Sequence, residues 1–328
     1  LNIPLGWLLG AMVANILAGM QGASLAIPQW LRSIAFIGLG AMLGTAFSPE
    51  LLDRIHRWTV TMAGMLCYLA IAIPCAFFYG RKVTGFDKLT AAFSSIPGGL
   101  GVMVILGASA GANPRTTALA HTARLATILM VLPFLLRQLI GIDLDAPVAA
   151  NRPIASITLA NAGLFISLAA LGSLTAKALR LPSPYLLGPL ILIGSTQVTD
   201  LTDFAIPIGF INVTQVIIGA GIGTAFSGAK PYELFKTFML SSGLTLLLLA
   251  LVILFAYVFN VWTGIGFAAL LLAFVPGGLA EIGMLALILN IDPVFVASHH
   301  AVRVLLITVT VPLLASRWLK RQERRGQM

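Results

Sequence analysis

The sequence predicts an all-α polytopic membrane protein made of two homologous repeats, and three observations carry this prediction. The 328-residue chain is 59% hydrophobic and 9% charged, whereas soluble globular domains are about 25% charged. Apolar stretches reach the roughly 20 residues that span a bilayer, as at 58–80, 154–176 and 236–259. Residues 97–100, Pro-Gly-Gly-Leu, return as residues 276–279 at an offset of 179. Internal duplication with broken helices is typical of secondary transporters.

The same offset relates further positions on both sides of the Pro-Gly-Gly motif. The matched pairs are Gly40 with Gly219, Gly44 with Gly223, Pro114 with Pro293, His121 with His300, and Arg124 with Arg303. We therefore predict a first membrane repeat at 1–140 and a second at 154–318. Residues 141–153 form a linker rich in polar residues and proline, and residues 319–328 form a basic tail.

Each repeat divides into apolar elements in a matching order. The first repeat has five, at 4–20, 28–48, 57–80, 88–112 and 114–140. The second has six, at 154–179, 184–199, 206–227, 235–259, 263–289 and 293–318. The first element of the second repeat has no counterpart, so we expect a further helix to precede Leu1.

Pro-Gly-Gly falls inside 88–112 and 263–289, where proline would break a helix. We expect each to be an interrupted helix or a re-entrant hairpin. We place the C-terminus on the inner side of the membrane and leave Arg124 and Arg303 out of the count, so that eighteen basic residues remain. If both Pro-Gly-Gly elements are re-entrant, fourteen of these residues lie on the inner side. If both elements span the membrane, eleven do. The positive-inside rule favours the re-entrant form. That form gives the complete six-element unit an odd number of crossings, so we predict that the repeats are inverted.

The net charge of +9 reflects membrane topology rather than nucleic-acid binding. Five basic residues lie within the last twelve positions, directly after an apolar helix. Such a cluster is typical of a cytoplasmic anchor. We expect a multi-pass protein of the bacterial inner membrane with a cytoplasmic C-terminus. Its partners would be the lipid bilayer and a small anionic molecule, with no nucleic acid, and a homodimer is compatible with the sequence.

Arg124 and Arg303 are the candidate substrate-binding cations. Each lies ten residues after the proline that begins its helix, or about 15 Å along it, near the middle of a hydrocarbon core about 30 Å thick. The breaks expose bare backbone at Gly98, Gly99, Gly277 and Gly278, followed by helix N-termini that favour anions. Either the arginines bind an anionic substrate, or they hold the broken helices through backbone carbonyls.

Three further titratable residues join this candidate site. His121 and His300 lie three residues before their arginines, on the same helical face, and are candidates for substrate contact, proton relay or structural hydrogen bonding. Glu281 stands where the first repeat has Val102. It could pair with Arg303, leaving Arg124 free for substrate, or take up a proton for coupling. Four histidines without a His, Cys and carboxylate cluster predict no metal, no cofactor and no enzyme activity.

The motifs together resemble those of the AbrB family of inner-membrane proteins. They are Pro-Gly-Gly-Leu followed by His-x-x-Arg in both repeats, Pro-Gly-Gly-Leu-Ala-Glu at 276–281, and Pro-x-x-(Trp/Tyr)-Leu-Leu-Gly at 4–10 and 182–188. Members carry the labels ammonia monooxygenase and regulator of aidB expression. The resemblance implies a duplicated, transporter-like membrane domain over the whole chain. It supplies no substrate, and the sequence has no histidine-rich site for the copper or iron of an oxygenase.

Two functions follow as hypotheses. The first is a secondary transporter that binds a small organic anion, or an acidic amphipathic molecule, at mid-membrane between the repeats, with proton coupling through Glu281 as an option. The alternative is a membrane-embedded regulatory or sensor protein that binds a ligand without moving it. The absence of a soluble domain in the sequence favours transport, because a sensor would have only short loops and the tail for its output.

Overall fold

The computed structural model describes residues 5–51, 55–141, 159–202, 204, 208–226 and 231–326, and these are almost entirely helical. The first half contains α1 (Gly6–Met20), α2 (Gln29–Gly44), the 3-10 turn η1 (Ile55–Arg57), α4 (Trp58–Lys82), α5 (Lys88–Ser95), α6 (Leu100–Ser109) and α7 (Pro114–Ile140). The second half contains α8 (Leu159–Ala178), α9 (Pro184–Val198), α10 (Ile208–Thr224), α11 (Pro231–Thr263), α12 (Phe267–Phe274), α13 (Leu279–Ile288) and α14 (Pro293–Gly326). The predicted linker lies outside these residues except for Gly141, which ends α7 in the left-handed region.

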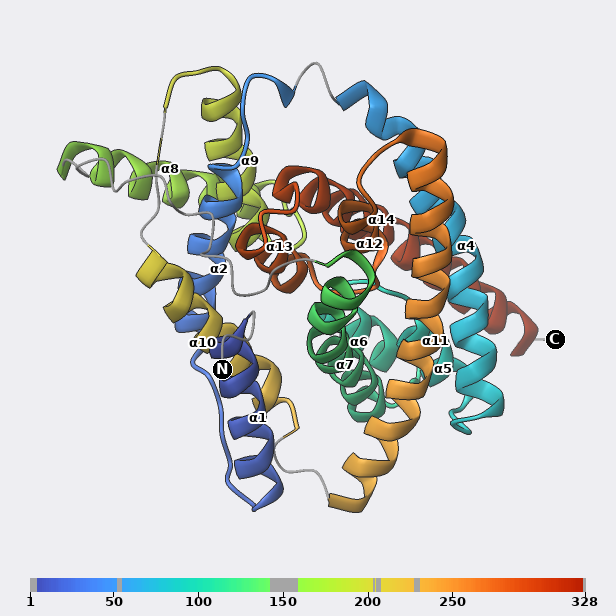
Figure 1. The fold of residues 1–328 in the computed structure, drawn as a ribbon. Helices are drawn as coiled ribbons and strands as arrows, with labels where there is room; N and C mark the ends of the chain where they lie inside the picture. Colours follow the sequence, from blue (N-terminus) through green and yellow to red (C-terminus); the bar gives the residue numbers. More distant parts are fainter. Residues whose placement is uncertain are drawn as a thin grey trace.

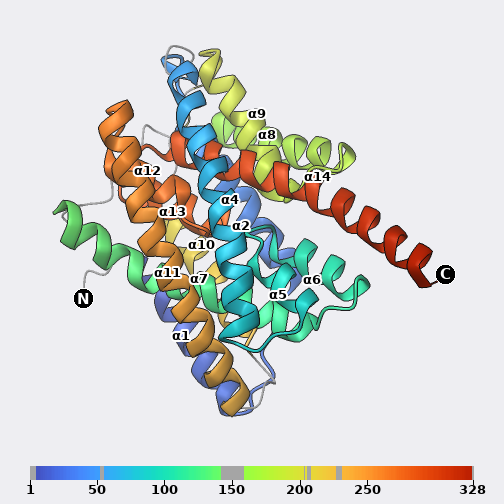
Figure 2. The ribbon, with the colours of Figure 1, turned by 90° about the vertical axis from the view of Figure 1, so that its right-hand side faces the viewer.

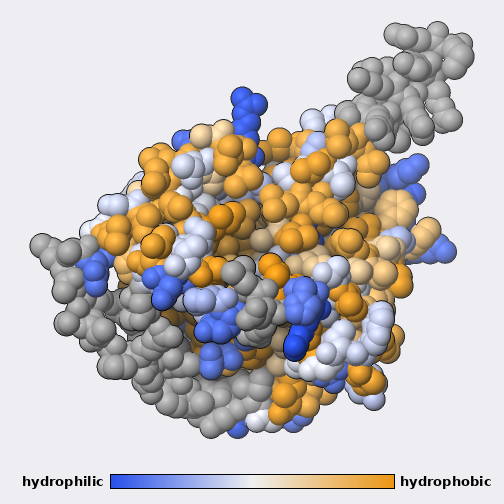
Figure 3. Space-filling model, turned by 90° about the horizontal axis from the view of Figure 1, so that it is seen from above, coloured by the Kyte–Doolittle hydropathy of each residue, from blue (hydrophilic) through white to orange (hydrophobic). Residues whose placement is uncertain are grey.

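Within the described chain, four helices are long and apolar enough to cross a membrane. They are 55–82, 114–140, 235–263 and 293–314. Seen from above, hydrophobic side chains cover much of the visible surface, and hydrophilic ones form separate patches (Figure 3). Both observations agree with the predicted membrane protein. Five further apolar helices, at 6–20, 100–109, 184–198, 210–224 and 279–288, have 10 to 17 residues, fewer than the roughly 20 that cross a bilayer.

The helices separate into a peripheral group and a central group (Figure 1). On one side α1 packs on α10, α2 on α9, and α8 on α9. The long helices α4 and α11 contact each other on the opposite side, and the two sets of broken helices with α7 and α14 lie between. In the view turned by 90°, α14 crosses the molecule and its C-terminal part extends away from it (Figure 2).

Glycine permits the close packing of the peripheral helices. A Cβ on Gly40 would lie 2.1 Å from the carbonyl oxygen of Leu186, and one on Gly219 would lie 2.1 Å from that of Leu8. Only glycine lets the backbones approach this closely, as its spacing in the sequence suggested. Each contact joins a helix of the first half to one of the second, so the two halves are interleaved.

The Pro-Gly-Gly motifs separate two pairs of short helices, α5 from α6 and α12 from α13. Both interruptions have the same turn: Gly98 N–H donates to the carbonyl of Ile96, and Gly277 N–H to that of Val275, each at 2.8 Å. Proline removes the N–H that would continue the preceding helix. The bounds of these four short helices recur at the offset of 179, as do the first residues of α7 and α14. Each pair packs against the long helix that follows it.

Candidate functional site

The guanidinium groups of Arg124 on α7 and Arg303 on α14 lie at the C-terminal ends of α5 and α12, the short helices that precede the breaks. Arg303 is 1% exposed, and its guanidinium donates to the carbonyl of Val275 at 2.7 Å and to that of Gly277. Arg124 is 5% exposed and makes one long bond, 3.3 Å, to the carbonyl of Ser94. Carbonyls at a helix C-terminus lack intrahelical partners and carry partial negative charge. The cations therefore meet carbonyl oxygens rather than the N-termini of α6 and α13.

His121 and His300 support the arginines in the same way. Nε2 of His121 bonds to the carbonyl of Phe93 at 2.9 Å, and Nε2 of His300 to that of Leu272 at 2.8 Å. Because a carbonyl only accepts, Nε2 carries the proton and Nδ1 is left to accept. Arg124 donates to Nδ1 of His121 at 2.7 Å and Arg303 to Nδ1 of His300 at 3.0 Å. Both histidines are thus neutral hydrogen-bonding groups that orient the arginines.

The hydrogen bonding of the two arginines differs in one respect. The terminal nitrogens of Arg303 donate to two carbonyls besides His300, and one of these carbonyls belongs to the glycine of the break itself. Arg124 has a single weak carbonyl contact besides His121. The Nε atoms of both arginines are buried without a partner. Arg303 consequently stabilises the second break, while Arg124 retains most of its capacity to bind another acceptor.

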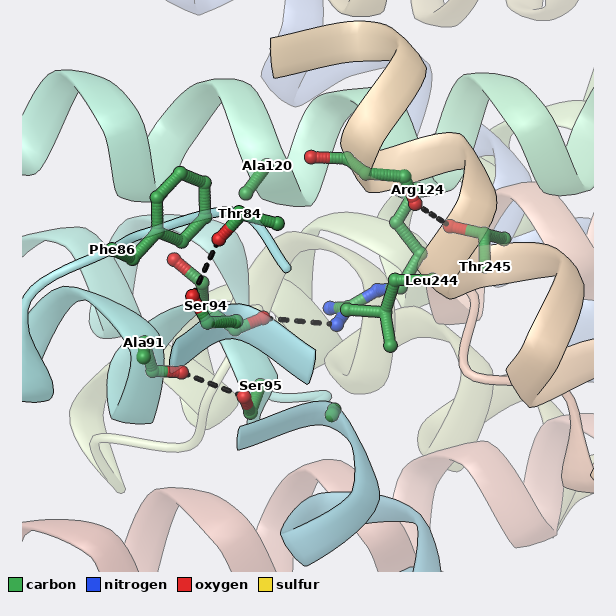
Figure 4. A pocket seen from close by; sticks show the side chains of 12 residues that line it. Thr84, Phe86, Ala91, Ser94, Ser95, Ala120, Arg124, Leu244 and Thr245 are labelled. Atoms are coloured by element: carbon green, nitrogen blue, oxygen red, sulfur yellow. Dashed lines mark hydrogen bonds between the residues drawn. The ribbon is translucent and has the colours of Figure 1, made fainter. Parts of the chain in front are cut away.

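A small cavity lies against Arg124. Its volume is about 10 Å³, room for about one water molecule. Its polar side chains besides Arg124 are Thr84, Ser94, Ser95, Ser241 and Thr245. Ser94 comes from α5 and Thr245 from α11 (Figure 4). The hydroxyls of Ser94 and Ser241 are buried without a partner, whereas Thr245 donates to the carbonyl of Ser241 at 2.8 Å. The remaining wall is mostly apolar, with Ala76, Phe86, Ala91, Ala120 and Leu244.

The glycines of the two breaks have different surroundings. A Cβ on Gly99 would have only Val102 nearby, at 3.9 Å, while one on Gly278 would lie 1.8 Å from Oε2 of Glu281. Gly98 packs against Ile307 of α14, and Gly277 against Ile282. The first break therefore has more free space around its second glycine, Gly99, than the second break has around Gly278.

Glu281 lies in the first turn of α13, 8% exposed, with its carboxylate against Gly278. The structure does not bring Glu281 and Arg303 together as an ion pair. Arg303 donates instead to backbone carbonyls and to His300. A carboxylate in the first turn interacts favourably with the helix dipole, which explains its position without Arg303.

Sequence reasoning missed the polar residues contributed by neighbouring helices. Ser94 immediately precedes the motif Ser95-Ile96-Pro97, so its place beside the break was readable from the sequence. Ser241 and Thr245 reach the cavity from α11, nearly 120 residues further along the chain. No local pattern signals that contact. In the part of the chain that the structure describes, no three His, Cys, Asp or Glu side chains gather to hold a metal ion.

Comparison with known proteins decides the family. The AbrB family model, described as "Transition state regulatory protein AbrB", matches residues 7–319. The chain belongs to the AbrB family. A Bacillus subtilis (strain 168) protein named "Uncharacterized protein YhjN" is 27% identical to this AbrB-family chain, over 95% of the chain and 86% of that protein. The Escherichia coli (strain K12) protein named "Putative regulator AbrB" is 25% identical, over 96% and 90%. No solved structure matches.

Proposed function

We propose that this AbrB-family protein is a secondary transporter of a small organic anion or an acidic amphipathic molecule. It would lie in the bacterial inner membrane with its C-terminus in the cytoplasm. The anion would bind between the two halves at Arg124, where α5, α7 and α11 meet. The proposal involves binding and movement only, with no catalysed reaction.

One observation carries the proposal: Arg124 is buried in a membrane protein with most of its hydrogen-bonding capacity unused. A buried arginine is costly in lipid unless it is satisfied. Arg303 shows how this fold satisfies one, through two backbone carbonyls. Arg124 has one carbonyl contact, at 3.3 Å, besides His121, and it lines the same cavity as Ser94 and Ser241, whose hydroxyls are unpartnered. An anion with several acceptor oxygens would complete all three groups.

The cavity at Arg124 has the size expected of a transport site that is closed to both sides of the membrane. At about 10 Å³ it excludes an organic anion, so binding requires its walls to separate. Movement of α11 relative to α5 would open it, because both helices line the cavity, α11 with Ser241 and α5 with Ser94. Such relative movement of the two halves is alternating access. Within this scheme Arg303 holds the second break, and Glu281 is the candidate proton-coupling residue.

The test is uptake into proteoliposomes with a panel of radiolabelled carboxylates, sulfate and phosphate. Arg124→Gln should lower uptake of the transported anion at least about tenfold, since it removes a charged hydrogen-bond donor worth about 1.5–3 kcal/mol. Arg137→Gln is the matched control, because Arg137 lies on the same helix and is exposed. Uptake by Arg124→Gln at the wild-type rate would exclude Arg124 from the transport site.

The names of the family and of the Escherichia coli relative favour a second candidate function, regulation. Both the family description and the name of the Escherichia coli relative contain a word for regulation. A regulatory membrane protein would bind a ligand at the same site and signal through its loops or basic tail. Deleting residues 317–328 separates the roles: transport should survive the deletion, whereas a regulatory output carried by the tail should not.

A further inference from the structure

His299 of α14 is fully buried and belongs to a chain of three hydrogen bonds. Its Nδ1 lies 2.8 Å from the carbonyl oxygen of Phe295, and its Nε2 lies 3.0 Å from Oγ1 of Thr61 on α4. That hydroxyl oxygen in turn lies 2.9 Å from the carbonyl oxygen of Trp58. The chain of bonds therefore ends in a carbonyl on each side, and it joins a helix of the first half to one of the second.

This chain of bonds is one proton short while the histidine is neutral. A carbonyl only accepts, so the bond to Phe295 needs a proton on Nδ1, and the bond to Trp58 needs the proton of the Thr61 hydroxyl. The bond between Thr61 and Nε2 then has no proton left, because a neutral imidazole carries a single N–H. A second ring proton, on Nε2, would complete all three bonds.

His121 and His300 are satisfied in the neutral form. In each, Nε2–H donates to a carbonyl and Nδ1 accepts from an arginine. A second ring proton would lie on Nδ1, face the arginine and remove that bond. Of the three buried histidines, His299 is thus the one that gains a hydrogen bond when it is protonated, whereas the other two lose one.

Aromatic rings surround the ring of His299. The centroid of the Phe295 ring lies 4.1 Å from that of His299, and those of Trp58 and Phe274 lie at 6.3 and 6.4 Å. Aromatic rings attract cations within about 6 Å of their centroids. Burial disfavours a charged imidazolium, and the ring of Phe295 offsets part of that cost.

The offset of 179 residues relates His299 to the proposed anion site of the first half. Its counterpart is Ala120 on α7, which lines the cavity at Arg124. The helices that meet correspond as well, since α7 packs on α11 as α14 packs on α4. The position that gives the cavity an alanine in the first half therefore carries a titratable ring in the second.

We infer that His299 is a proton-binding site, and that its proton is bound and released together with the transported anion. The inference deepens the proposed transport function and rests on it. The proton comes from water, binds Nε2 and is donated to Oγ1 of Thr61, while the proton on Nδ1 stays bonded to the carbonyl of Phe295. Glu281 is the alternative carrier of the coupling proton, and the experiment below separates the two.

Charge explains why the proton and the anion would bind together. Within the described chain, the buried titratable groups on α14 and on the helices packed against it are Tyr68 of α4, Glu281 of α13, and His300 and Arg303 of α14. Helices α6 and α12 have none, and Arg32 of α2 is exposed. None of these groups shares a hydrogen bond with His299, so no carboxylate pairs with an imidazolium there. A bound anion supplies negative charge, and each ligand then favours binding of the other.

A polar pocket at the start of α14 lies near His299. Its volume is about 310 Å³, and its lining includes Asn290, Asp292 and Val294, so it has room for several water molecules. Val294 precedes His299 by five residues, or about 7.5 Å along the helix. A proton entering from this pocket has to pass less than two turns of α14.

Nitrogen-15 NMR of histidine-labelled protein in bilayers counts the protons on each ring. Between about pH 8 and pH 5, His299 should pass from one protonated nitrogen to two, whereas His121 and His300 keep one. His299→Gln assigns the signal by removing it. Thr61→Val should keep His299 neutral, because Nε2–H loses its acceptor, and Thr61→Ser should retain the transition. A His299 ring that carries one proton over this whole range, with and without the anions of the transport panel, overturns the inference.

Uptake into proteoliposomes tests the coupling, with uptake by protein-free liposomes subtracted. An inwardly directed proton gradient should stimulate wild-type uptake of the transported anion of the panel and leave uptake by His299→Gln unstimulated. His56→Gln is the matched control, because His56 is exposed, and it should keep the stimulation.

The outcomes separate this inference from the transport proposal. Gradient-stimulated uptake by His299→Gln, or stimulation lost in Glu281→Gln alone, overturns the inference and leaves the transport proposal intact. Wild-type protein that takes up none of the carboxylates, sulfate or phosphate overturns the transport proposal, and the coupling with it. The NMR measurement then still decides whether His299 binds a proton.

Discussion

The first and second breaks share one backbone turn and one His–Arg arrangement, yet their environments differ. In the second half, all residues from Leu279 to Ala286 of α13 are buried. In the first half, only Met103 and Gly107 of α6 are buried. Arg303 donates to two carbonyls and Arg124 to one, at a longer distance. The comparison teaches that a duplicated motif can hold its arginine firmly in one copy and leave more donors unused in the other, as the proposed anion site requires.

The sharpest test of this division is the stability of Arg303→Ala against Arg124→Ala. Arg303→Ala leaves the carbonyl of Gly277 without its donor and that of Val275 with the N–H of Gly277 alone, and should lower the free energy of unfolding by about 3–5 kcal/mol. Arg124→Ala removes one long carbonyl bond and should cost about 1 kcal/mol. Unfolding in mixed SDS micelles measures both values.

His121→Ala and His300→Ala extend the same measurement as controls for the supporting histidines. Each histidine bonds one carbonyl and one arginine at similar distances, so the two variants should cost similar amounts. Equal losses for the two arginine variants would contradict the assignment of scaffold and binding site to different halves.

Sequence alone predicted the architecture well because its signals are local or repeated. Hydrophobic length identified α4, α7, α11 and α14 as long apolar helices. The proline expected to begin the helix of Arg124 does begin α7, and the side chain of Asn113 before it accepts from the N–H of Thr116. The motif Pro-Gly-Gly located the ends of the short helices. Helix capping and proline geometry act over a few residues, so they need no tertiary information.

The functional asymmetry could be predicted only in part. Glu281 at the position of Val102 revealed that the halves differ, but pairing with Arg303, one of its two proposed roles, did not appear. Arg303 donates to backbone carbonyls instead. Ser241 and Thr245 were missed because they reach the cavity from α11, which packs on α7. Whether the halves are inverted, and whether the short helices re-enter, stay predictions from the charge distribution.

The next largest difference in the free energy of unfolding is expected between Gly278→Ala and Gly99→Ala. A Cβ at Gly278 would overlap Oε2 of Glu281, while one at Gly99 meets only ordinary contact with Val102. Gly278→Ala should therefore cost about 1–3 kcal/mol through overpacking, and Gly99→Ala less than about 0.5 kcal/mol. Adding Glu281→Ala to Gly278→Ala should recover most of the loss. Failure of that double variant to recover would show that the clash is not with the carboxylate.

The smallest difference in the free energy of unfolding is expected for two hydrogen bonds, one of which joins α4 and the other α11 to a helix of the opposite half. Thr61 of α4 bonds Nε2 of His299 on α14 at 3.0 Å, and Ser242 of α11 bonds Thr127 on α7 at 2.8 Å. His299 is fully buried among Trp58, Phe274 and Phe295.

Thr61→Val leaves that ring nitrogen unpaired and should cost about 1 kcal/mol. Ser242→Ala should cost less than about 0.5 kcal/mol, because Thr127 keeps its bond to the carbonyl of Ala123 at 2.8 Å. The same SDS unfolding measurement applies. If Ser242→Ala proves the costlier change, the contact between α7 and α11 is a fixed support rather than one that can part. The opening of the Arg124 cavity would then have to occur elsewhere.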